Sequence, residues 1–439
     1  MSAPPLTARL PRLLAGVGES GAEGPLDLAR HITTHGPMPP QEPPKRGRPG
    51  ALVDEIERAG LRGRGGAGFP TALKLHAVAG ARGRGRTVVV NATEGEPASS
   101  KDRTLLGSVP HLVLDGAALA AQAVGADEAI LCVPDDTPGV LQAATSAISE
   151  RRRMPGDPRL TLATVPHGYV SGQESALVAA LNGGEAKPTF TPPMIFERGV
   201  GGRPTLLSNA ETFAHVALIA RHGAEWFRAL GTPEHPGTAL ITLAGPVAYP
   251  GVYEIEHGAT LSSLIDAAGG ALEGVRAVLV GGYSGTWLDG SLLEEITLDD
   301  GWLVPRQATT GAGVVALLGE HACGVYETVR VARWMAGESA GQCGPCVHGL
   351  AAIAQRLEGI AWGNEQGGEA EVLRLASVIR GRGACRHPDG TLRFVASALQ
   401  VFAEEFADHA RHGACDLCGA HGVLPLPRAA ARELEGVAR

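Results

Sequence analysis

The stretch HLVLDGAALAAQAVGADEAILCVP (111–134) sets the fold class of the first half of the chain. Residues 111–126 predict an apolar helix, and EAILCVP (128–134) predicts a buried strand. The same alternation continues outward, with strands expected at 87–91 and 160–166 and helices at 51–60, 139–150 and 174–184. Strands that alternate with helices indicate an α/β domain with a largely parallel sheet.

The pattern changes on either side of this α/β domain, which is expected to span 51–235. Residues 1–50 predict an N-terminal arm that ends in a Pro- and Gly-dense linker, GPMPPQEPPKRGRPG (36–50), which cannot continue a helix or strand. Residues 236–310 predict a small β-rich domain with one helix, and residues 311–439 are mainly helical. Helices are expected there at 324–337, 348–358, 369–381 and 391–411.

Composition excludes several classes of protein. Hydrophobic residues make up 44% and charged residues 19% of the 439 residues, which is typical of a folded chain with two to four domains. The net charge of −8 gives no general attraction to nucleic acid or anionic lipid. Neither a signal peptide nor a run of ~18 apolar residues is visible. A cytoplasmic location is therefore expected, with any membrane association made through partner subunits.

The seven cysteines predict reduced thiols or metal ligands, because their number is odd and no secretory signal is seen. Cys132 lies in an expected buried strand and is interpreted as a core residue, as is Cys323 at the start of an expected helix. His348, next to a Cys-x-x-Cys pair, is not expected to be a ligand. The histidines at 409 and 412 are expected to be solvated.

A glycine-rich loop, Gly63-Arg64-Gly65-Gly66-Ala67-Gly68, matches the pattern G-x-G-x-x-G. A dinucleotide fingerprint requires a preceding strand, whereas a helix is expected before this loop. The loop can still cradle a phosphate, because glycines allow close backbone approach and a helix beginning near Pro70-Thr71 would offer N–H groups. A tight turn between two helices is the alternative.

Three polar residues, Asn91, Glu94 and Glu96, follow the expected strand TVVVN (87–91). They therefore lie at the carboxyl end of a strand, where open α/β sheets bind ligands. Carboxylates there could accept hydrogen bonds from ribityl or ribose hydroxyls. A solvated acidic turn is the alternative.

Two strings, GLRGRGGAGFPTALK (60–74) and VNATEGEPASSKDR (90–103), together resemble the FMN-binding region of the flavoprotein subunit of respiratory complex I. YVSGQESALVAALNGGEAKP (169–188) and PTLLSNAETFAHV (204–216) match the same family in order, and residues 244–270 resemble its β-grasp domain. Similar chains occur in NAD-linked hydrogenases and formate dehydrogenases.

This resemblance implies an NADH dehydrogenase-like oxidoreductase. The implied fold is a Rossmann-like FMN domain, a β-grasp domain and a C-terminal helical bundle that carries an iron–sulfur motif. Hydride would pass from NAD(P)H to FMN, and single electrons would then pass to a 4Fe–4S cluster. A thioredoxin-like iron–sulfur subunit is the implied partner.

The resemblance also implies the residues of the cofactor site. The FMN phosphate would be held by Gly63, Arg64, Gly65, Gly66, Gly68 and Lys74. The flavin would lie between Asn91 and Glu94 on one side and Ser208, Asn209 and Thr212 on the other. Glu96, Tyr169, Gly172 and Glu174 would line the nicotinamide nucleotide site, and Phe69 would stack on adenine. The chain departs from the family at Thr93, where an aspartate is usual, and at Ala77 and Met194, where phenylalanines are usual.

The cluster motif departs further. The family pattern E-S-C-x-x-C-x-x-C is matched by Glu338–Cys346, but its first cysteine position is Ala340, which cannot bind metal. The implied metal ligands are Cys343, Cys346 and Cys385, one fewer than the four thiolates of a four-iron cluster. Three interpretations stay open: a substitute ligand from Cys323, Cys415 or Cys418, a cluster on three thiolates, or zinc bound by the pairs 343/346 and 415/418. The absence of any metal is the fourth.

Two other functions remain open. One is a non-catalytic binding or assembly module in which the glycine loop is a relic and the β-grasp domain is the working surface. The other is a clusterless FMN reductase that transfers electrons to a free acceptor. Bound flavin would argue against the non-catalytic module, and bound iron would argue against the clusterless reductase.

Overall fold

The computed structural model describes residues 10–18, 24–41, 50–83, 85–152, 154–364, 367–418 and 422–427. Most of the expected linker lies outside them. The chain forms two compact units. Unit 1 comprises the chain up to Gly95, Ser100–Ile241 and Val252–Ala259, and unit 2 comprises Glu96–Ser99, Thr242–Gly251 and the chain from Thr260.

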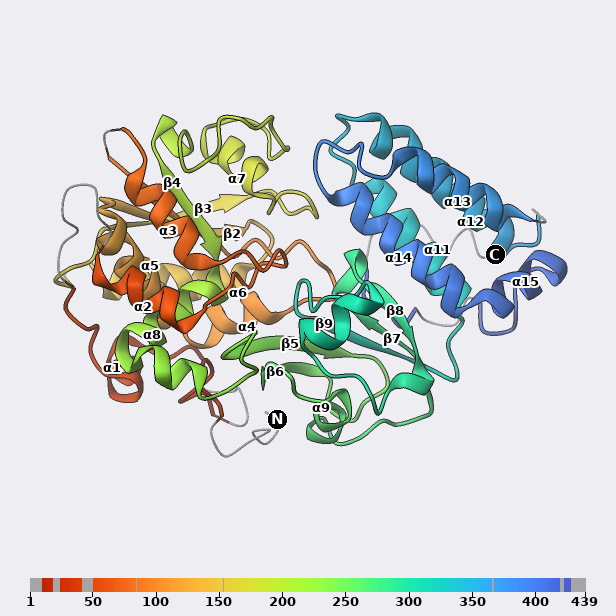
Figure 1. Cartoon of the computed structure of the whole chain (residues 1–439), viewed down its shortest axis with the longest axis horizontal. Coiled ribbons are helices and arrows are strands. Elements are labelled where there is room, and N and C mark those ends of the chain that lie inside the picture. Colours follow the sequence, from red (N-terminus) through yellow and green to blue (C-terminus); the bar gives the residue numbers. More distant parts are fainter. Residues whose placement is uncertain are drawn as a thin grey trace. The chain divides into compact units, whose positions relative to one another are not determined.

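Unit 1 is built on a four-stranded sheet of the order β3-β2-β1-β4. Figure 1 labels three of these strands, β2, β3 and β4, among the helices of unit 1. All neighbouring strands in it are parallel, as the sequence predicts. The strands are β1 (Thr87–Asn91), β2 (Glu128–Pro134), β3 (Arg159–Val165) and β4 (Thr205–Asn209). Every residue of β2 is buried, which explains why its sequence is apolar without alternation.

Helices cover both faces of this sheet. Val88 and Val90 of β1 belong to the large core that includes α5 and α8, whereas Val89 belongs to a smaller core with Leu177 and Val178 of α7. The helices of unit 1 are α1 (Leu28–His35), α2 (Ala51–Ala59), α3 (Thr71–Gly80), α4 (Lys101–Ser108), α5 (Pro110–Val124), α6 (Pro138–Glu150), α7 (Glu174–Leu181) and α8 (Ala210–Arg228).

The strand order creates a topological switch point between β1 and β4. The chain leaves β1 for β2 and β3 on one side, and then returns to the other side of β1 as β4. In register, Asn91 and Asn209 are direct partners at the carboxyl ends of these two strands. Ligands of open α/β sheets bind at such a point, so the fold itself marks this edge as the candidate site.

Unit 2 contains most of a five-stranded mixed sheet of the order β6-β5-β9-β7-β8. β5 is parallel to β9, whereas β7 is antiparallel to both β8 and β9. Most of β5 (Thr238–Ala244) and of β6 (Gly251–Glu256) falls within the residues of unit 1. Unit 2 holds α9 (Leu261–Ala267), β7 (Val275–Val280), β8 (Thr286–Asp289), α10 (Asp300–Leu303) and β9 (Val314–Gly319). A mixed sheet with a helix after its first hairpin agrees with the expected β-grasp fold.

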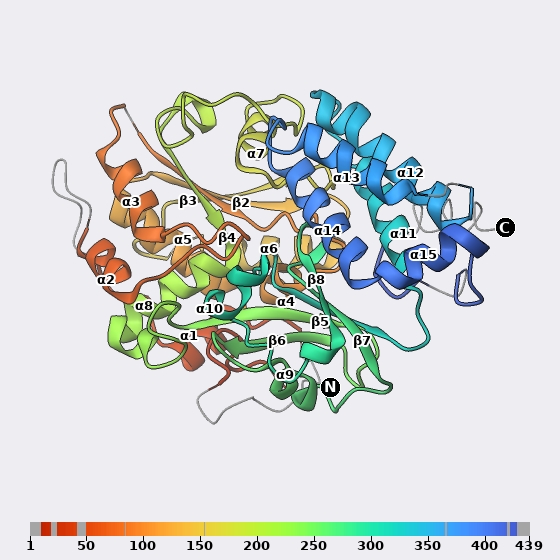
Figure 2. The ribbon, with the colours of Figure 1, turned by 45° about the vertical axis from the view of Figure 1, so that its right-hand side comes forward.

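The rest of unit 2 is a group of helices (Figure 2). They are α11 (Gly324–Gly337), a π-helical turn η5 (Pro345–Leu350) that continues directly into α12 (Ala351–Ala361), α13 (Gly368–Ile379), α14 (His387–Val401) and α15 (Ala403–His412). The single helix expected over 391–411 is wrong, because the chain turns at Phe402. The buried Phe402 ring packs edge-on against Trp287 at this turn.

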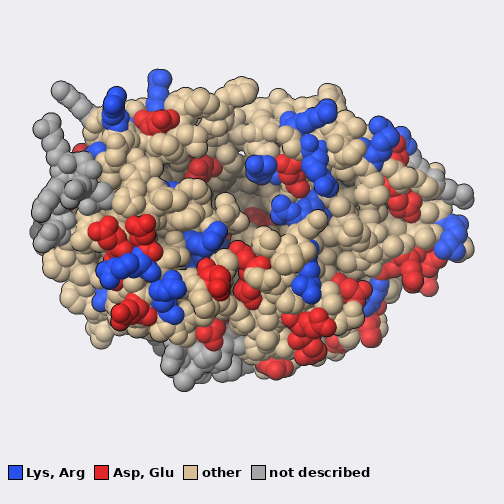
Figure 3. Space-filling model, in the orientation of Figure 1, with Lys and Arg blue, Asp and Glu red and all other residues tan. Residues whose placement is uncertain are grey.

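In the described part of the chain, no helix alone has the length and apolar character of a membrane span, although α4 and α5, which meet at 95°, would pass that test if joined. α5 is almost entirely buried within unit 1. On the face shown in Figure 3, basic and acidic side chains are interspersed.

Candidate cofactor sites

The glycine-rich loop lies between α2 and α3, as the sequence predicts. Hydrogen bonds close its base, from Gly63 N–H to the Phe69 carbonyl at 2.8 Å and from Arg62 Nε to the Gly68 carbonyl at 2.8 Å. Gly66 and Gly68 adopt φ of 100° and 59°, a region that side chains other than glycine rarely occupy. Residues 65–67 at the tip are exposed. Their backbone is therefore accessible to a phosphate.

The loop is fastened to the start of α8. Arg64 N–H donates to Thr212 Oγ1 at 2.9 Å, and a Cβ at Gly65 would lie 3.3 Å from Asn209 Cβ. The Arg64 guanidinium points inward, where it donates to the Thr238 carbonyl at 3.0 Å and lies 3.8 Å from Glu211. Arg64 and Thr212 thus hold the loop against the carboxyl end of β4.

The carboxyl ends of β1 and β4 carry the predicted flavin residues. Asn91 donates from Nδ2 to the Gly172 carbonyl at 2.8 Å and accepts from the Thr93 hydroxyl. Asn209 is the N-cap of α8 and donates to Asp102 at 2.7 Å. The Glu94 carboxylate accepts from the N–H groups of residues 102 and 103 at 3.2 Å each, at the first turn of α4. Ser208 is buried in β4.

A buried ion-pair network beneath this edge was not predicted. Lys101 Nζ lies 2.9 Å from Asp102 Oδ1, 3.0 Å from Glu211 Oε2 and 3.1 Å from Asn209 Oδ1. Burial raises the pKa of Asp102 to about 6. Burial also acts to raise the pKa of Glu211, but the charge of Lys101 and hydrogen bonding outweigh it and lower that pKa to about 2. Lys101 and Asp102 lie inside the string VNATEGEPASSKDR, but periodicity gives no sign that they are buried.

A second loop packs tightly against the residues that follow β1. A Cβ at Gly172 would lie 2.6 Å from Thr93 Oγ1, and a Cβ at Gly95 would lie 2.5 Å from the Gly168 carbonyl oxygen. Neither position can accept a larger residue without moving its neighbours. The loop that contains Tyr169 and Gly172 is thereby held beside Asn91. This places one predicted nucleotide-site segment next to one predicted flavin residue.

The remaining predicted residues lie in different surroundings. Lys74 on α3 forms an ion pair with Glu174 at the start of α7, and it donates to the Leu207 carbonyl at 3.2 Å. The Phe69 side chain is 46% exposed, as stacking on a ligand requires. Glu96 belongs to unit 2, where its carboxylate accepts from Tyr283 N–H at 2.9 Å.

The residues at the switch point fit FMN. The exposed tip of the glycine loop offers backbone without Cβ atoms at Gly65 and Gly66, and Lys74 is partly buried on the helix that follows the loop. Phosphate is favoured at such a position by backbone N–H groups and by a nearby ammonium. Asn91 and Asn209 place amide groups on the adjacent strand ends. We therefore assign the candidate FMN site to this edge of unit 1.

Three of the late cysteines lie together in unit 2. Burial raises the pKa of Cys346 to about 12, and the neighbouring thiols of Cys343 and Cys385 add to the rise. Ser339 contributes a side-chain hydrogen bond to Cys346. The expected metal ligands are thus brought together near the start of η5. Three thiols do not complete a four-thiolate set, and Ala340 offers no ligand atom.

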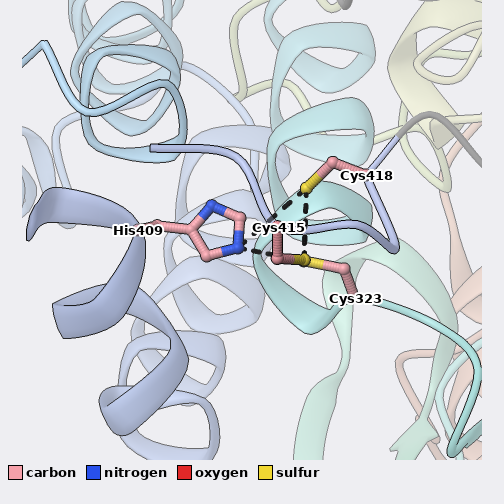
Figure 4. Close-up of side chains that lie close together, drawn as sticks. All are labelled: Cys323, His409, Cys415 and Cys418. Carbon is pink, nitrogen blue, oxygen red and sulfur yellow. Dashed lines mark hydrogen bonds between the residues drawn. The ribbon is translucent and has the colours of Figure 1, made fainter. Parts of the chain in front are cut away.

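The other cysteines form a second group with a histidine (Figure 4). Sγ of Cys418 lies 3.6 Å from Cys415 Sγ, 3.7 Å from Cys323 Sγ and 4.0 Å from His409 Nε2. His409 is only 2% exposed, so the expectation that it is solvated is wrong. Cys323 is buried as expected, but it belongs to this polar group rather than to an apolar core. Position 323, position 409 and the 415–418 turn are separated in sequence, and the fold brings them together.

The two cysteine groups lie at opposite ends of one helical segment. Cys346 is in η5, which continues into α12, and His409 Nδ1 lies 2.9 Å from the carbonyl of Ala361 at the other end of α12. From Cys346 to Ala361 this helical segment spans roughly 20 Å, at about 1.5 Å per residue. Cys323, Cys415 and Cys418 therefore cannot replace the ligand missing at Ala340. A site made of the pairs 343/346 and 415/418 is excluded for the same reason.

Comparisons with known proteins identify three family regions along the chain. Residues 56–218 match the family model described as the Nuo51 FMN-binding domain, residues 240–284 match the SLBB domain, and residues 327–409 match the NADH-ubiquinone oxidoreductase-F iron-sulfur binding region. The chain is 33% identical over 382 residues to the F 2 subunit of the NADH-quinone oxidoreductase of Rhizobium meliloti (strain 1021), with 84% of this chain and 90% of the relative covered.

Two further relatives belong to hydrogenases. The NADP-reducing hydrogenase subunit HndC of Solidesulfovibrio fructosivorans is 30% identical, with 84% of this chain and 77% of the relative covered. A crystal structure of an NAD+-reducing nickel–iron hydrogenase in the H2-reduced state superimposes with a TM-score of 0.76 at 34% identity. That alignment covers 82% of this chain and 62% of the hydrogenase chain.

The fold, the switch-point site and these matches define an NADH dehydrogenase-like flavoprotein oxidoreductase with an iron–sulfur region. The chain belongs to the family of the F subunits of NADH-quinone oxidoreductase, the flavoprotein subunits of respiratory complex I. The resemblance inferred from the sequence is confirmed.

Proposed function

We propose that this chain oxidises a reduced nicotinamide nucleotide at the carboxyl ends of β1 and β4 and delivers electrons to an iron–sulfur cluster in its helical region. The observation that carries this proposal is the glycine loop fastened at the switch point by Arg64 and Thr212. Bound FMN would supply the chemistry, because it accepts a hydride and releases electrons singly.

The protein's own residues would bind and orient the two ligands. The loop backbone and Lys74 would hold the phosphate, and the amides of Asn91 and Asn209 would position the ring system. The segment around Tyr169 and Gly172 would receive the nicotinamide nucleotide, with Phe69 against its adenine. Because Gly172 backs directly onto Thr93, the two binding segments are positioned by the same contact.

The cluster would be held by Cys343, Cys346 and Cys385. Its remaining coordination position has no cysteine within the motif, since Ala340 stands at the first position. A thioredoxin-like iron–sulfur subunit is the proposed partner, by analogy with the subunit composition of the family. A cytoplasmic location, with any membrane association made through partner subunits, follows from the same analogy.

The proposal is tested by steady-state reduction of ferricyanide by NADH and by NADPH, using FMN-loaded protein and the variant Gly65→Val. The valine side chain would meet Asn209, so we expect the variant to lose bound FMN and activity with either nucleotide. Gly139→Ala in α6, where an added Cβ meets nothing within 4 Å, is the matched control and should retain both. Full activity in flavin-free Gly65→Val would contradict the proposal.

A further inference from the structure

We propose that Cys323, His409, Cys415 and Cys418 bind a single zinc ion in a closed structural site of unit 2. This site is separate from the cluster motif and does not depend on the function proposed above. Each residue offers one ligand atom, and the four atoms lie within 4.8 Å of one another. Three sulfurs and one imidazole nitrogen are a common ligand set of structural zinc.

The distances match the edges of one tetrahedron. With Zn–S bonds of about 2.3 Å and a Zn–N bond of about 2.0–2.1 Å, tetrahedral geometry places two sulfurs ~3.8 Å apart and a sulfur and a nitrogen ~3.6 Å apart. Of the six edges, two S–S distances are 3.6 and 3.7 Å and two S–N distances are 3.5 and 4.0 Å. The other two edges are within 4.8 Å. A four-iron cluster binds each thiolate to a different iron, which spreads the sulfurs farther apart. The geometry therefore favours a single ion.

The imidazole is oriented for coordination. His409 Nδ1 lies 2.9 Å from the Ala361 carbonyl, which fixes the proton on Nδ1 and turns Nε2 toward the sulfurs (Figure 4). Histidine ligands of zinc usually donate their second nitrogen to a carbonyl or carboxylate in this way. The ring orientation that coordination through Nε2 requires is thus already set.

The thiols are held by local backbone. Cys323 is the N-cap of α11, and its Sγ accepts from the N–H of Tyr326 at 3.3 Å. Cys418 N–H donates to the Cys415 carbonyl at 3.0 Å, which forms the turn of a Cys-x-x-Cys knuckle. Four protein ligands would leave no coordination position open. The ion would therefore be structural rather than catalytic.

The site would fasten the end of the chain to the start of α11. Residues 414–416 are exposed, whereas Cys323 and His409 are buried. Farther on, the N–H groups of Val423 and Leu424 donate to the Glu327 carboxylate, one turn beyond Cys323, at 3.1 and 2.9 Å. Zinc would thus join α15 and the 415–418 turn to the helix that receives the C-terminal segment.

Metal analysis of the full-length protein, purified without added metal, tests the proposal. We expect about one zinc per chain in the parent. Cys415→Ser, chosen because Cys415 is exposed, should lose zinc after dialysis against a chelator and keep its iron. Cys346→Ser is the matched control and should lose iron and keep zinc. The proposal would be overturned if the group of Cys323, His409, Cys415 and Cys418 held iron rather than zinc. Zinc retained in both Cys415→Ser and Cys418→Ser would also overturn it.

X-ray absorption at the zinc edge and hydrogen exchange give a second readout. We expect three sulfur neighbours at about 2.3 Å and one nitrogen at about 2.0–2.1 Å. Chelation should increase the rate of deuterium uptake in residues 409–418 and 422–427 by about tenfold or more and leave α5 unchanged. A zinc-free parent that folds with Cys415 and Cys418 in a disulfide, or a zinc shell of oxygen and nitrogen only, would also overturn it.

Discussion

A single positive charge at Lys74 joins two predicted binding segments. Its Nζ contacts the carboxylate of Glu174, a residue predicted to line the nucleotide site. It also donates to the Leu207 carbonyl in β4, next to the predicted flavin residue Ser208. A phosphate held by the glycine loop would compete with Glu174 for this ammonium. Lys74 would therefore bind the phosphate when FMN is present and pair with Glu174 when FMN is absent.

Replacing Lys74 with alanine should weaken FMN binding by roughly 10- to 100-fold, because a charge-assisted hydrogen bond to phosphate is lost. The dissociation constant is measured by quenching of FMN fluorescence on titration of flavin-free protein. Lys187→Ala removes an exposed lysine that pairs with Glu185 and serves as the control. Equal dissociation constants for the parent and Lys74→Ala would show that Lys74 does not bind the phosphate.

The buried charges beneath the site predict a different phenotype. Lys101 is 3% exposed and neutralises Asp102 and Glu211. Lys101→Met should lower the free energy of unfolding by about 3–5 kcal/mol, since it removes the nearest cation from two buried carboxyl groups and leaves Glu211 only the more distant Arg64. Urea unfolding at pH 7 measures the loss. A change below about 1 kcal/mol would mean that water or another cation replaces Lys101.

At the scale of the elements, α5 and α8 pack so closely that only glycine fits at position 116. A Cβ there would lie 1.7 Å from the Phe213 carbonyl oxygen. Gly116→Ala should therefore destabilise unit 1 by about 2–3 kcal/mol or more, because the backbone of α8 must move. Gly139→Ala, with nothing near its added Cβ, should be neutral or slightly stabilising. Similar unfolding midpoints for the two variants would refute this packing argument.

Helices and strands with a clear hydrophobic pattern were predictable from the sequence. The burial of individual polar residues was not. Strand β2 is a continuous apolar run, and α11 begins and ends at the predicted residues. The break at Phe402 was missed because the local pattern is continuous there, whereas the ring's partner Trp287 is distant in sequence. Lys101 and His409 were missed for the same reason, since charged and polar side chains resemble surface residues until the fold supplies their partners.

The candidate flavin site was predicted from motifs, because its glycine loop and strand ends are local in sequence. The group of Cys343, Cys346 and Cys385 was also predicted from its motif. The second cysteine group was not, since proximity between 323, 409 and 415–418 is created by α11, α12 and α15. Equal Cys-x-x-Cys spacing suggested that the pairs 343/346 and 415/418 belong together. The rigid length of α12 keeps them apart.

At the scale of the whole molecule, buried neutral histidines make stability depend on pH. Burial lowers the pKa of His35 and of His215 to about 4, and it lowers the pKa of His257 well below its usual value. A histidine whose pKa is depressed in the folded state stabilises fully above pH ~6.5, and that contribution is lost as the pH falls toward 4. Burial raises the pKa of four carboxyl groups, Asp102, Asp157, Glu254 and Glu327, which works in the opposite direction. Six histidines have pKa values lowered by burial, and they outnumber these carboxyl groups.

The free energy of unfolding should therefore fall between pH 7 and pH 5, with about 2 kcal/mol attributable to His215 alone. Urea unfolding at pH 7, 6 and 5 measures the slope. His215→Gln removes one titrating group and should flatten the curve without abolishing it. A stability that is constant or rises as the pH falls over this range would contradict the burial of neutral imidazoles.

We expect a flavin at the switch point of unit 1 to be reduced by a nicotinamide nucleotide and to be accompanied by an iron–sulfur cluster. The absorption spectrum of anaerobically purified protein, recorded before and after addition of NADH, tests both expectations. We predict flavin bands with a broad iron–sulfur shoulder, both bleached by NADH. Flavin bands without the shoulder would indicate a clusterless reductase, and a colourless protein would contradict the redox account altogether.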